Sequence, residues 1–201
     1  MPTAIDDLLG FWLGVPDPPG AAPPQVSARW WKKDDAFDAE LRQRFGALHA
    51  QAVAGELDTW AASPRGRVAL VILLDQLSRN LYRGDARAFA QDARAAALTI
   101  AALDAREHEA LVPLHAYFLF MPLMHAEDLA LQERCVTCFE QGATRVTDSG
   151  LSALFTSGAD FARRHRDIVA RFGRFPHRNA VLGRASSAEE LEFLKQPGSS
   201  F

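Results

Sequence analysis

Polar side chains that interrupt an apolar helical stripe are the strongest chemical signal in this sequence. A helix is expected from Ser63–Pro64 onward, and its first half is apolar on every side. At about 100° per residue, the stripe that carries Val68 and Ile72 continues into Asp75 and Arg79. Their i, i+4 spacing allows an ion pair, which would serve either a ligand site or the packing of a central helix.

Two other expected helices place histidine on an inward face. His125 and Asp128 fall on the core side of a helix expected over 126–141, whereas Glu127 points away, towards another helix, solvent or a loop. His165 lies among apolar residues of the longest expected helix. A histidine on an apolar face is either a hydrogen-bonded core residue or a titratable group of a site, and the sequence leaves both alternatives open.

A loop at residues 173–186 is rich in arginine. Arg174, His177, Arg178 and Asn179 present hydrogen-bond donors there in close succession. Guanidinium groups suit phosphate or carboxylate, and a histidine adds a titratable donor. The same side chains could equally bind helix carbonyls and acidic residues, so the loop alone does not distinguish a ligand site from a structural clamp.

Taken together, these segments predict a pocket for a small anionic ligand, either a phosphate or a carboxylate. Acid–base chemistry would fall to His125, Asp128 and His177. No activated nucleophile is apparent, which disfavours an acyl-enzyme mechanism, and the sequence leaves open whether the protein is an enzyme. The residues expected to bind the ligand are Asp75, Arg79, Asn80, Arg83, His165, Arg174, Arg178 and Asn179. No metal or other cofactor is expected, because the excess of arginine in these segments opposes a cation.

Two other functions are consistent with the same residues. Stacked helical hairpins can bind a peptide or protein partner in a concave groove, with Trp30, Trp31 and Trp60 as exposed anchors. A purely structural role would make the Asp, Arg and His residues a buried network that fixes helix packing. A cavity lined by the arginines and histidines would favour the ligand pocket. If these side chains instead pair fully with one another and leave no cavity, the structural network is favoured.

The elements needed to position these residues are all helical. Cap signals and apolar spacing predict roughly eight helices and no convincing strand, so we expect a single all-α domain, residues 1–201, built of antiparallel helical hairpins. A proline-rich loop is expected at 15–26, and Pro122 is expected to break or kink the chain. Capping boxes at Thr3 and Ser187 predict two helix starts.

Composition and charge exclude several classes of protein. With 48% hydrophobic and 23% charged residues the chain is typical of a globular protein, and a net charge of -3 argues against nucleic-acid or anionic-membrane binding. The longest apolar run, Val68 to Leu74, is too short to span a bilayer, and no secretory signal is visible. Cys135 and Cys138 are expected to be reduced packing residues of a cytoplasmic protein that is monomeric or weakly dimeric.

Three stretches of the sequence are similar to one bacterial family. They read LLDQLSRNLYRG at residues 73–84, MPLMHAED at 121–128 and FGRFPHRN at 172–179. With them, nearly the whole chain resembles the bacterial domain of unknown function 924 family. The resemblance implies an all-helical, tetratricopeptide-like fold, and it implies no activity. The cysteine pair departs from the family pattern.

Overall fold

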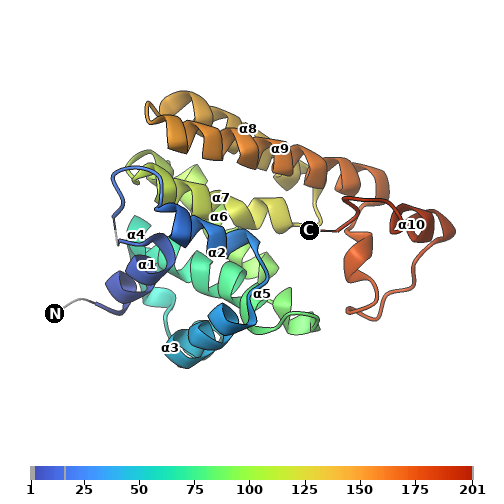
Figure 1. Cartoon of the computed structure of the whole chain (residues 1–201), viewed down its shortest axis with the longest axis horizontal. Helices are drawn as coiled ribbons and strands as arrows, with labels where there is room; N and C mark the ends of the chain where they lie inside the picture. The colour runs from blue at the N-terminus through green and yellow to red at the C-terminus, as the bar shows by residue number, and fades with distance from the viewer. Residues whose placement is uncertain (1–2, 16, 201) are drawn as a thin grey trace.

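The computed structural model of the chain describes residues 3–15 and 17–200, and Figure 1 shows the arrangement of its helices. The α-helices are α1 (Ala4–Leu13), α2 (Pro24–Trp31), α3 (Asp35–Ala54), α4 (Pro64–Val71), α5 (Ser78–Leu81), α6 (Asp92–Asp104), α7 (Pro113–His125), α8 (Leu129–Arg145), α9 (Ser149–Phe172) and α10 (Ala188–Phe193). No β-strand occurs within the two described ranges, which confirms the predicted all-α class. The tetratricopeptide-like arrangement stays a prediction.

Local capping interactions start several of these helices. The capping boxes at Thr3 and Ser187 are both present, which confirms the predicted starts of α1 and α10. The proline-rich loop is shorter than predicted, because Pro24 occupies the first turn of α2. Proline fits there because N–H groups of the first turn have no acceptor within the helix. Residues 17–23 are irregular, and residue 16 of the predicted loop lies outside the described residues.

One continuous stretch of helix runs from Pro64 to Leu81 and changes its winding in the middle. α4 leads into a π-helical segment, Ile72–Leu77, which leads into α5. Every residue of the π-helical segment is buried, and Asp75 lies within it. Short π-helical segments inside α-helices are rare and occur often at functional sites, so this segment directs attention to Asp75.

The predicted helix break at Pro122 does not occur, because α7 continues through it to His125, and the predicted alternative of a kink stays a prediction. The physical reason is burial: every residue from Leu114 to His125 is buried, so packing on all sides stabilises a helix that proline alone would end. The next helix accordingly begins later than predicted. Asp128 is the N-cap of α8 and is exposed, so its predicted inward orientation is wrong.

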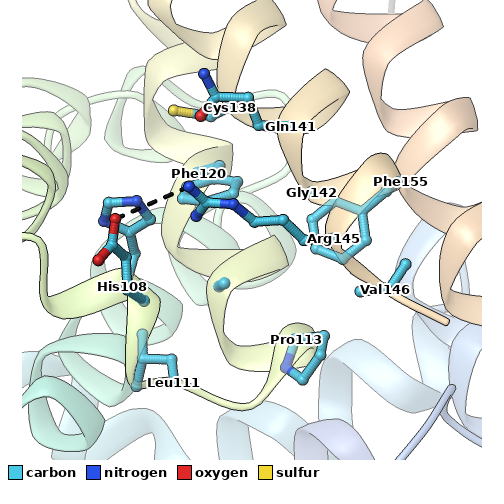
Figure 2. Close-up of a pocket in the computed structure, with 12 residues that line it drawn as sticks. His108, Leu111, Pro113, Phe120, Cys138, Gln141, Gly142, Arg145, Val146 and Phe155 are labelled. Atoms are coloured by element: carbon cyan, nitrogen blue, oxygen red, sulfur yellow. Dashed lines mark ion pairs between the residues drawn. The ribbon is translucent and has the colours of Figure 1, made fainter. Parts of the chain in front are cut away.

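The two longest helices of the C-terminal half, α8 and α9, lie side by side across one face of the molecule (Figure 1). Glycine allows their close approach. Gly142 of α8 lies against the ring of Phe155 of α9 (Figure 2), and Gly158 of α9 lies against the ring of Phe139 of α8. A Cβ atom at either glycine would overlap the facing ring, so the small residues set the distance between the helices.

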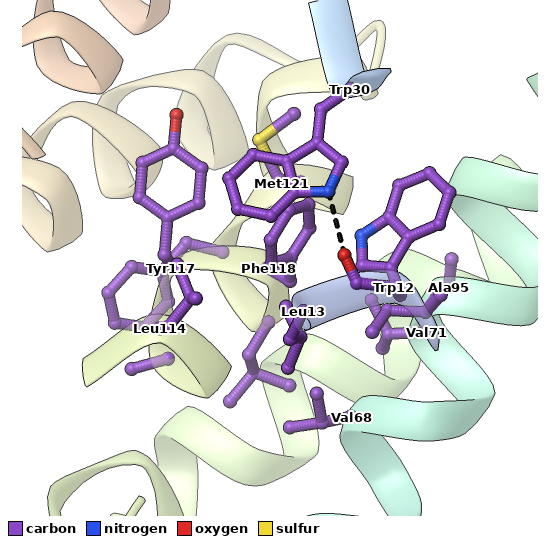
Figure 3. Packing of buried hydrophobic residues seen from close by; sticks show 14 of the residues in the cluster. Trp12, Leu13, Trp30, Val68, Val71, Ala95, Leu114, Tyr117, Phe118 and Met121 are labelled. Carbon is purple, nitrogen blue, oxygen red and sulfur yellow. Dashed lines mark hydrogen bonds between the residues drawn. The ribbon is translucent and has the colours of Figure 1, made fainter. Parts of the chain in front are cut away.

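The hydrophobic core is centred on α7. Phe118 packs edge-on against Trp12 of α1 and Trp30 of α2, with ring centroids 5.9 and 4.8 Å apart, and Trp30 Nε1 donates a hydrogen bond to the Trp12 carbonyl at 2.9 Å (Figure 3). Trp30 is therefore buried, which corrects the prediction of an exposed anchor. Trp60 is partly buried against the same core, and Trp31 is 54% exposed.

The C-terminal segment, residues 173–200, folds beyond the end of α9 (Figure 1). Gly173 ends α9 in the left-handed region, with φ of 69°, and Phe175 then joins Ile168 and Val169 in a small apolar cluster separate from the main core. A single turn of 3₁₀-helix, Pro176–Arg178, follows. Polar contacts with the start of α6 and the end of α7 connect this segment to the body of the protein, and these contacts form the candidate site.

Candidate functional site

A buried carboxylate and a histidine form the centre of the site. The Asp75 carboxylate is completely buried in the π-helical segment and accepts hydrogen bonds from His125 Nδ1 at 2.7 Å, Arg79 Nη1 at 3.0 Å and Gln76 Nε2 at 2.6 Å. Burial opposes ionisation of this carboxyl group, but Arg79 and His125 outweigh that effect and hold its pKa below the usual value. Asp75 is therefore a carboxylate at neutral pH.

His125 is oriented by this contact. Burial lowers the pKa of His125, and the nearby Arg79 lowers it further, so the imidazole is neutral at pH 7. Because Nδ1 faces an ionised carboxylate, Nδ1 carries the proton and donates it to Asp75. Nε2 then keeps a free lone pair, and it has no hydrogen-bond partner among residues 3–15 and 17–200. This arrangement can accept a proton from a bound molecule.

Asp92, in the first turn of α6, binds two arginines. Arg79 reaches both of its oxygens at 3.0 Å, and Arg178 Nη1 lies 3.0 Å from Oδ2. The buried guanidinium of Arg178 is sandwiched between the rings of Phe89 and Phe175, at 4.5 and 4.4 Å from their centroids. Burial lowers the pKa of Arg178 to about 10, although Asp92 opposes the shift. Its Nε is buried without a hydrogen-bond partner within the described ranges.

Three of these groups, Asp92, His125 and Arg178, line a pocket of about 670 Å³. The pocket lies between the 3₁₀ turn before α6, α6 itself, the link from α7 to α8, and the C-terminal segment. Its polar lining residues are Asp92, His125, Glu127, Asp128 and Arg178. The rest of the wall is apolar and consists of Ala86, Phe89, Ala90, Ala93, Ala96, Ala97, Ile100, Ala126, Leu131 and Leu182. An apolar cavity with a few convergent polar groups is the usual form of a small-molecule site.

The structure brings five of the predicted site residues together. His125, Asp128 and Arg178 line the pocket, and Asp75 and Arg79 lie directly behind His125 and Asp92. Asp128 also has a structural role, because its side chain accepts a hydrogen bond from the Leu131 amide and caps α8.

Two further predicted histidines lie behind the pocket and do not line it. His165 packs between the rings of His125 and Phe175, at 6.3 and 5.5 Å, and its Nδ1 lies 2.8 Å from the Phe161 carbonyl. Burial, with a smaller effect of His125, lowers the pKa of His165 to about 3. His177 lies against the ring of Phe175, and burial together with Arg178 lowers its pKa to about 4.

Four other predicted ligand residues have hydrogen-bond partners elsewhere and do not line the pocket. Arg174 forms a two-point ion pair with Glu190 of α10, at 2.6 and 2.8 Å, so it is separated from Arg178. Asn179 bonds to Ser186 and Arg184 within the C-terminal segment. Asn80 and Arg83 both bind Asp38 on α3, on another side of α5. Because these partners occupy the side chains, the structure does not place them in the pocket.

Sequence reasoning missed Asp92 and Phe89 and only partly anticipated Glu127. Glu127 contacts a loop, as one of the alternatives predicted: it accepts hydrogen bonds from the Phe175 amide at 2.8 Å and from Arg184 at 2.6 and 2.8 Å. Asp92 carries only the weak signal of an acid in the first turn of a helix, which is more often a response to the helix dipole.

Two other features bear on chemistry. The Ser78 hydroxyl lies 2.9 Å from His49 Nε2, but both residues are buried and neither lines the pocket. Within the described part of the chain, no group of three or more His, Cys, Asp or Glu residues is arranged to hold a metal ion. In the same residues, no helix is both long enough and apolar enough to cross a membrane.

Comparisons with known proteins identify the family of this chain. No curated protein matches the sequence significantly. A solved structure, that of the protein of unknown function ATU0120 from Agrobacterium tumefaciens, is 34% identical to this chain and superposes with a TM-score of 0.79, covering 95% of this chain and 96% of the other. The family model of the bacterial proteins of unknown function called DUF924 matches residues 8–198. This chain therefore belongs to the DUF924 family.

Proposed function

We propose that the pocket beside His125 binds a small molecule with an apolar body and one anionic group, a carboxylate or a phosphate. The observation that carries the proposal is Arg178, a buried guanidinium at the polar end of an apolar cavity, with an Nε that has no partner in the described residues. A buried donor without an acceptor raises the free energy of the folded protein. An anionic oxygen of a ligand would supply that acceptor and also compensate the charge.

Most of the charged side chains around the pocket are paired with one another. Arg79 and Arg178 face Asp75 and Asp92, so the inner cluster is balanced, and Glu127 is paired with Arg184. Even so, the lowered pKa of Arg178 means that burial destabilises its charge more than Asp92 stabilises it. A ligand anion beside Arg178 would reverse that balance, while the apolar wall would gain about 25 cal/mol per Å² of ligand surface buried.

His125 gives the same site a chemical capacity. Its Nδ1 is fixed by Asp75 and its Nε2 is available at the pocket, so it would accept a proton from a bound ligand as a general base. Asp75, Arg79 and Asp92 would act as the buried network that holds this geometry. The network predicted as a structural alternative and the pocket are thus parts of one arrangement in this proposal.

Calorimetric titration of the full chain with hexanoate, hexanol and inorganic phosphate tests the proposal. Hexanoate should bind about tenfold more tightly than hexanol, because only the carboxylate reaches Arg178. Arg178→Met should remove this preference. Arg174→Met is the matched control, since it deletes an arginine of the same segment that pairs with Glu190 outside the pocket, and it should bind hexanoate like the wild type.

Three results would count against the site. Equal affinity for hexanoate and hexanol would show that the pocket does not prefer an anionic group. Binding of hexanoate by Arg178→Met at wild-type strength would place the carboxylate elsewhere. Binding of phosphate as tight as that of hexanoate would show that the apolar wall contributes nothing.

A further inference from the structure

A second pocket, of about 210 Å³, lies on another side of α7 (Figure 2). It is enclosed by the 3₁₀ turn Glu107–Glu109, by α7 and by the C-terminal half of α8, with Phe155 contributed by α9. It shares no lining residue with the pocket beside His125. A ligand in it would therefore be independent of the function proposed above.

Most of the wall of this pocket is apolar, and part of it is aromatic. Phe120 and Phe155 line it, and the ring of His108 meets Phe120 edge-on with centroids 6.0 Å apart. Gly142 lets Phe155 come close to α8, so the position of that ring depends on the missing side chain. A dry cavity of about 150 Å³ can hold benzene. The volume here fits one aromatic ring with small substituents.

His108 supplies a polar group inside the pocket. Its Nδ1 is buried and has no hydrogen-bond partner in the described part of the chain. Burial lowers the pKa of His108, and although Glu109 opposes this shift, the ring is neutral at pH 7. A ligand hydroxyl both donates and accepts hydrogen bonds, so it would satisfy this nitrogen in either tautomer of the ring.

Arg145 supplies a cation on the opposite side. Figure 2 shows it extending from α8 across the pocket towards His108. The ion pair that Arg145 forms with Glu109 is long, at 3.8 Å, and Glu109 is held more closely by Arg106, at 2.9 and 3.1 Å. A ligand carboxylate could therefore bind Arg145 without leaving Glu109 unpaired.

We propose that this second pocket binds a small hydroxylated aromatic acid. The ring lies against the apolar wall, beside the edges of Phe120 and Phe155, whose own centroids are 6.5 Å apart. The hydroxyl group bonds to His108 Nδ1, and the carboxylate pairs with Arg145. The contacts come from four elements of the fold: α7 and α9 for the ring, the 3₁₀ turn for the hydroxyl group and α8 for the carboxylate. A molecule that lacks the hydroxyl or the carboxylate loses one of these contacts.

Isothermal titration of the full chain with 3- and 4-hydroxybenzoate, benzoate and phenol tests this proposal. At least one hydroxybenzoate should bind about fivefold or more tightly than benzoate and phenol, which is the effect of one lost polar contact. His108→Phe keeps the aromatic ring and should abolish the preference over benzoate. Arg145→Gln should abolish the preference over phenol.

The matched control is Arg134→Gln, which removes the same charge from α8 at a residue that pairs with Asp104 outside the pocket, and it should bind like the wild type. The proposal is overturned if neither hydroxybenzoate binds at about 10 mM, well above the usual range of weak specific affinities. It is equally overturned if His108→Phe and Arg145→Gln bind them like the wild type. Loss of binding in Arg178→Met would place the probe in the first pocket and would also overturn it.

Discussion

The buried charged side chains of the site pair with one another. Asp75 has no contact with solvent, and three side chains, those of Gln76, Arg79 and His125, donate hydrogen bonds to it. Removing one member of such a cluster leaves another buried polar group without its partner, which costs more than the bond itself contributed. The residues of the site therefore differ in how far the fold depends on them.

Asp75→Asn should lower the free energy of unfolding by about 3 kcal/mol or more, because Arg79 and His125 both lose the charge they face. His125→Ala should cost clearly less, since the Asp75 carboxylate still has Arg79 and Gln76. His177→Ala should also cost less, since His177 is not one of the three donors to Asp75. Urea unfolding at pH 7 measures all three. Asp104→Asn, which alters an exposed ion pair with Arg134, should stay within about 0.5 kcal/mol of the wild type. Histidine variants as unstable as Asp75→Asn would contradict this division.

The buried histidines make stability depend on pH. The pKa of His165 is about 3 in the folded protein, against about 6.5 for an unfolded chain, so below pH 6.5 the unfolded state binds a proton that the folded state does not. Stability should therefore fall as the pH is lowered from 7 to 5, by up to about 2 kcal/mol for this residue. Urea unfolding at both pH values should show a smaller loss for His165→Phe. An unchanged pH dependence in that variant would exclude His165 as a source.

At the scale of elements, the protein departs from regular helix geometry where its chemistry lies. The π-helical segment Ile72–Leu77 gives the central helix a different winding at Asp75, whereas the apolar spacing of the sequence predicts a uniform α-helix there. Close packing is the other decisive feature, because Gly142 and Gly158 allow aromatic rings to lie directly on the facing helix. Both features depend on single residues inside otherwise ordinary helices.

Gly142→Ala and Gly158→Ala should each destabilise the protein by about 1–3 kcal/mol, because the new methyl group overlaps Phe155 or Phe139 in a packed interface. Gly46→Ala in α3 is the control. Its Cβ would meet nothing closer than 3.8 Å, and alanine favours a helix interior, so it should stabilise the protein by up to about 1 kcal/mol. Thermal unfolding measures the three variants. The packing argument fails if the three glycines respond alike.

At the scale of the whole molecule, the first pocket lies where the C-terminal segment meets the helical body. Arg178 connects the segment to Asp92 of α6, and Glu127 binds both the Phe175 amide and Arg184. The segment has its own small apolar cluster and is not part of the main core. Its position therefore depends on a few polar contacts, and the shape of the pocket depends on its position.

Glu127→Gln should make the C-terminal segment more accessible to trypsin, because it removes the charge that binds Arg184. Cleavage after Arg174 or Arg184 should be several-fold faster, while far-ultraviolet circular dichroism stays unchanged. Glu133→Gln makes the same charge change at an exposed residue of α8 and should be cleaved like the wild type. Equal cleavage of both variants would show that Glu127 does not hold the segment.

The sequence by itself determined what depends on short separations along the chain. The helix starts at Thr3 and Ser187 follow from hydrogen bonds between residues three apart, so they form wherever the chain goes. Helical periodicity likewise marked Asp75 and His125 as polar residues on apolar faces, and both proved to be buried, although His125 ends α7 and does not belong to the helix on which it was predicted. The all-α class follows from the same local signals.

Only the tertiary structure decided which partners those residues meet. Arg178 binds Asp92 across 86 residues of sequence, whereas Arg174, four residues earlier, binds Glu190. No local rule separates the two arginines. Pro122 stays inside α7 for a similar reason, since burial on all sides outweighs its local preference to end a helix. Long-range contacts depend on the path of the whole chain, and that path is set by the packing of all the helices together rather than by any one segment.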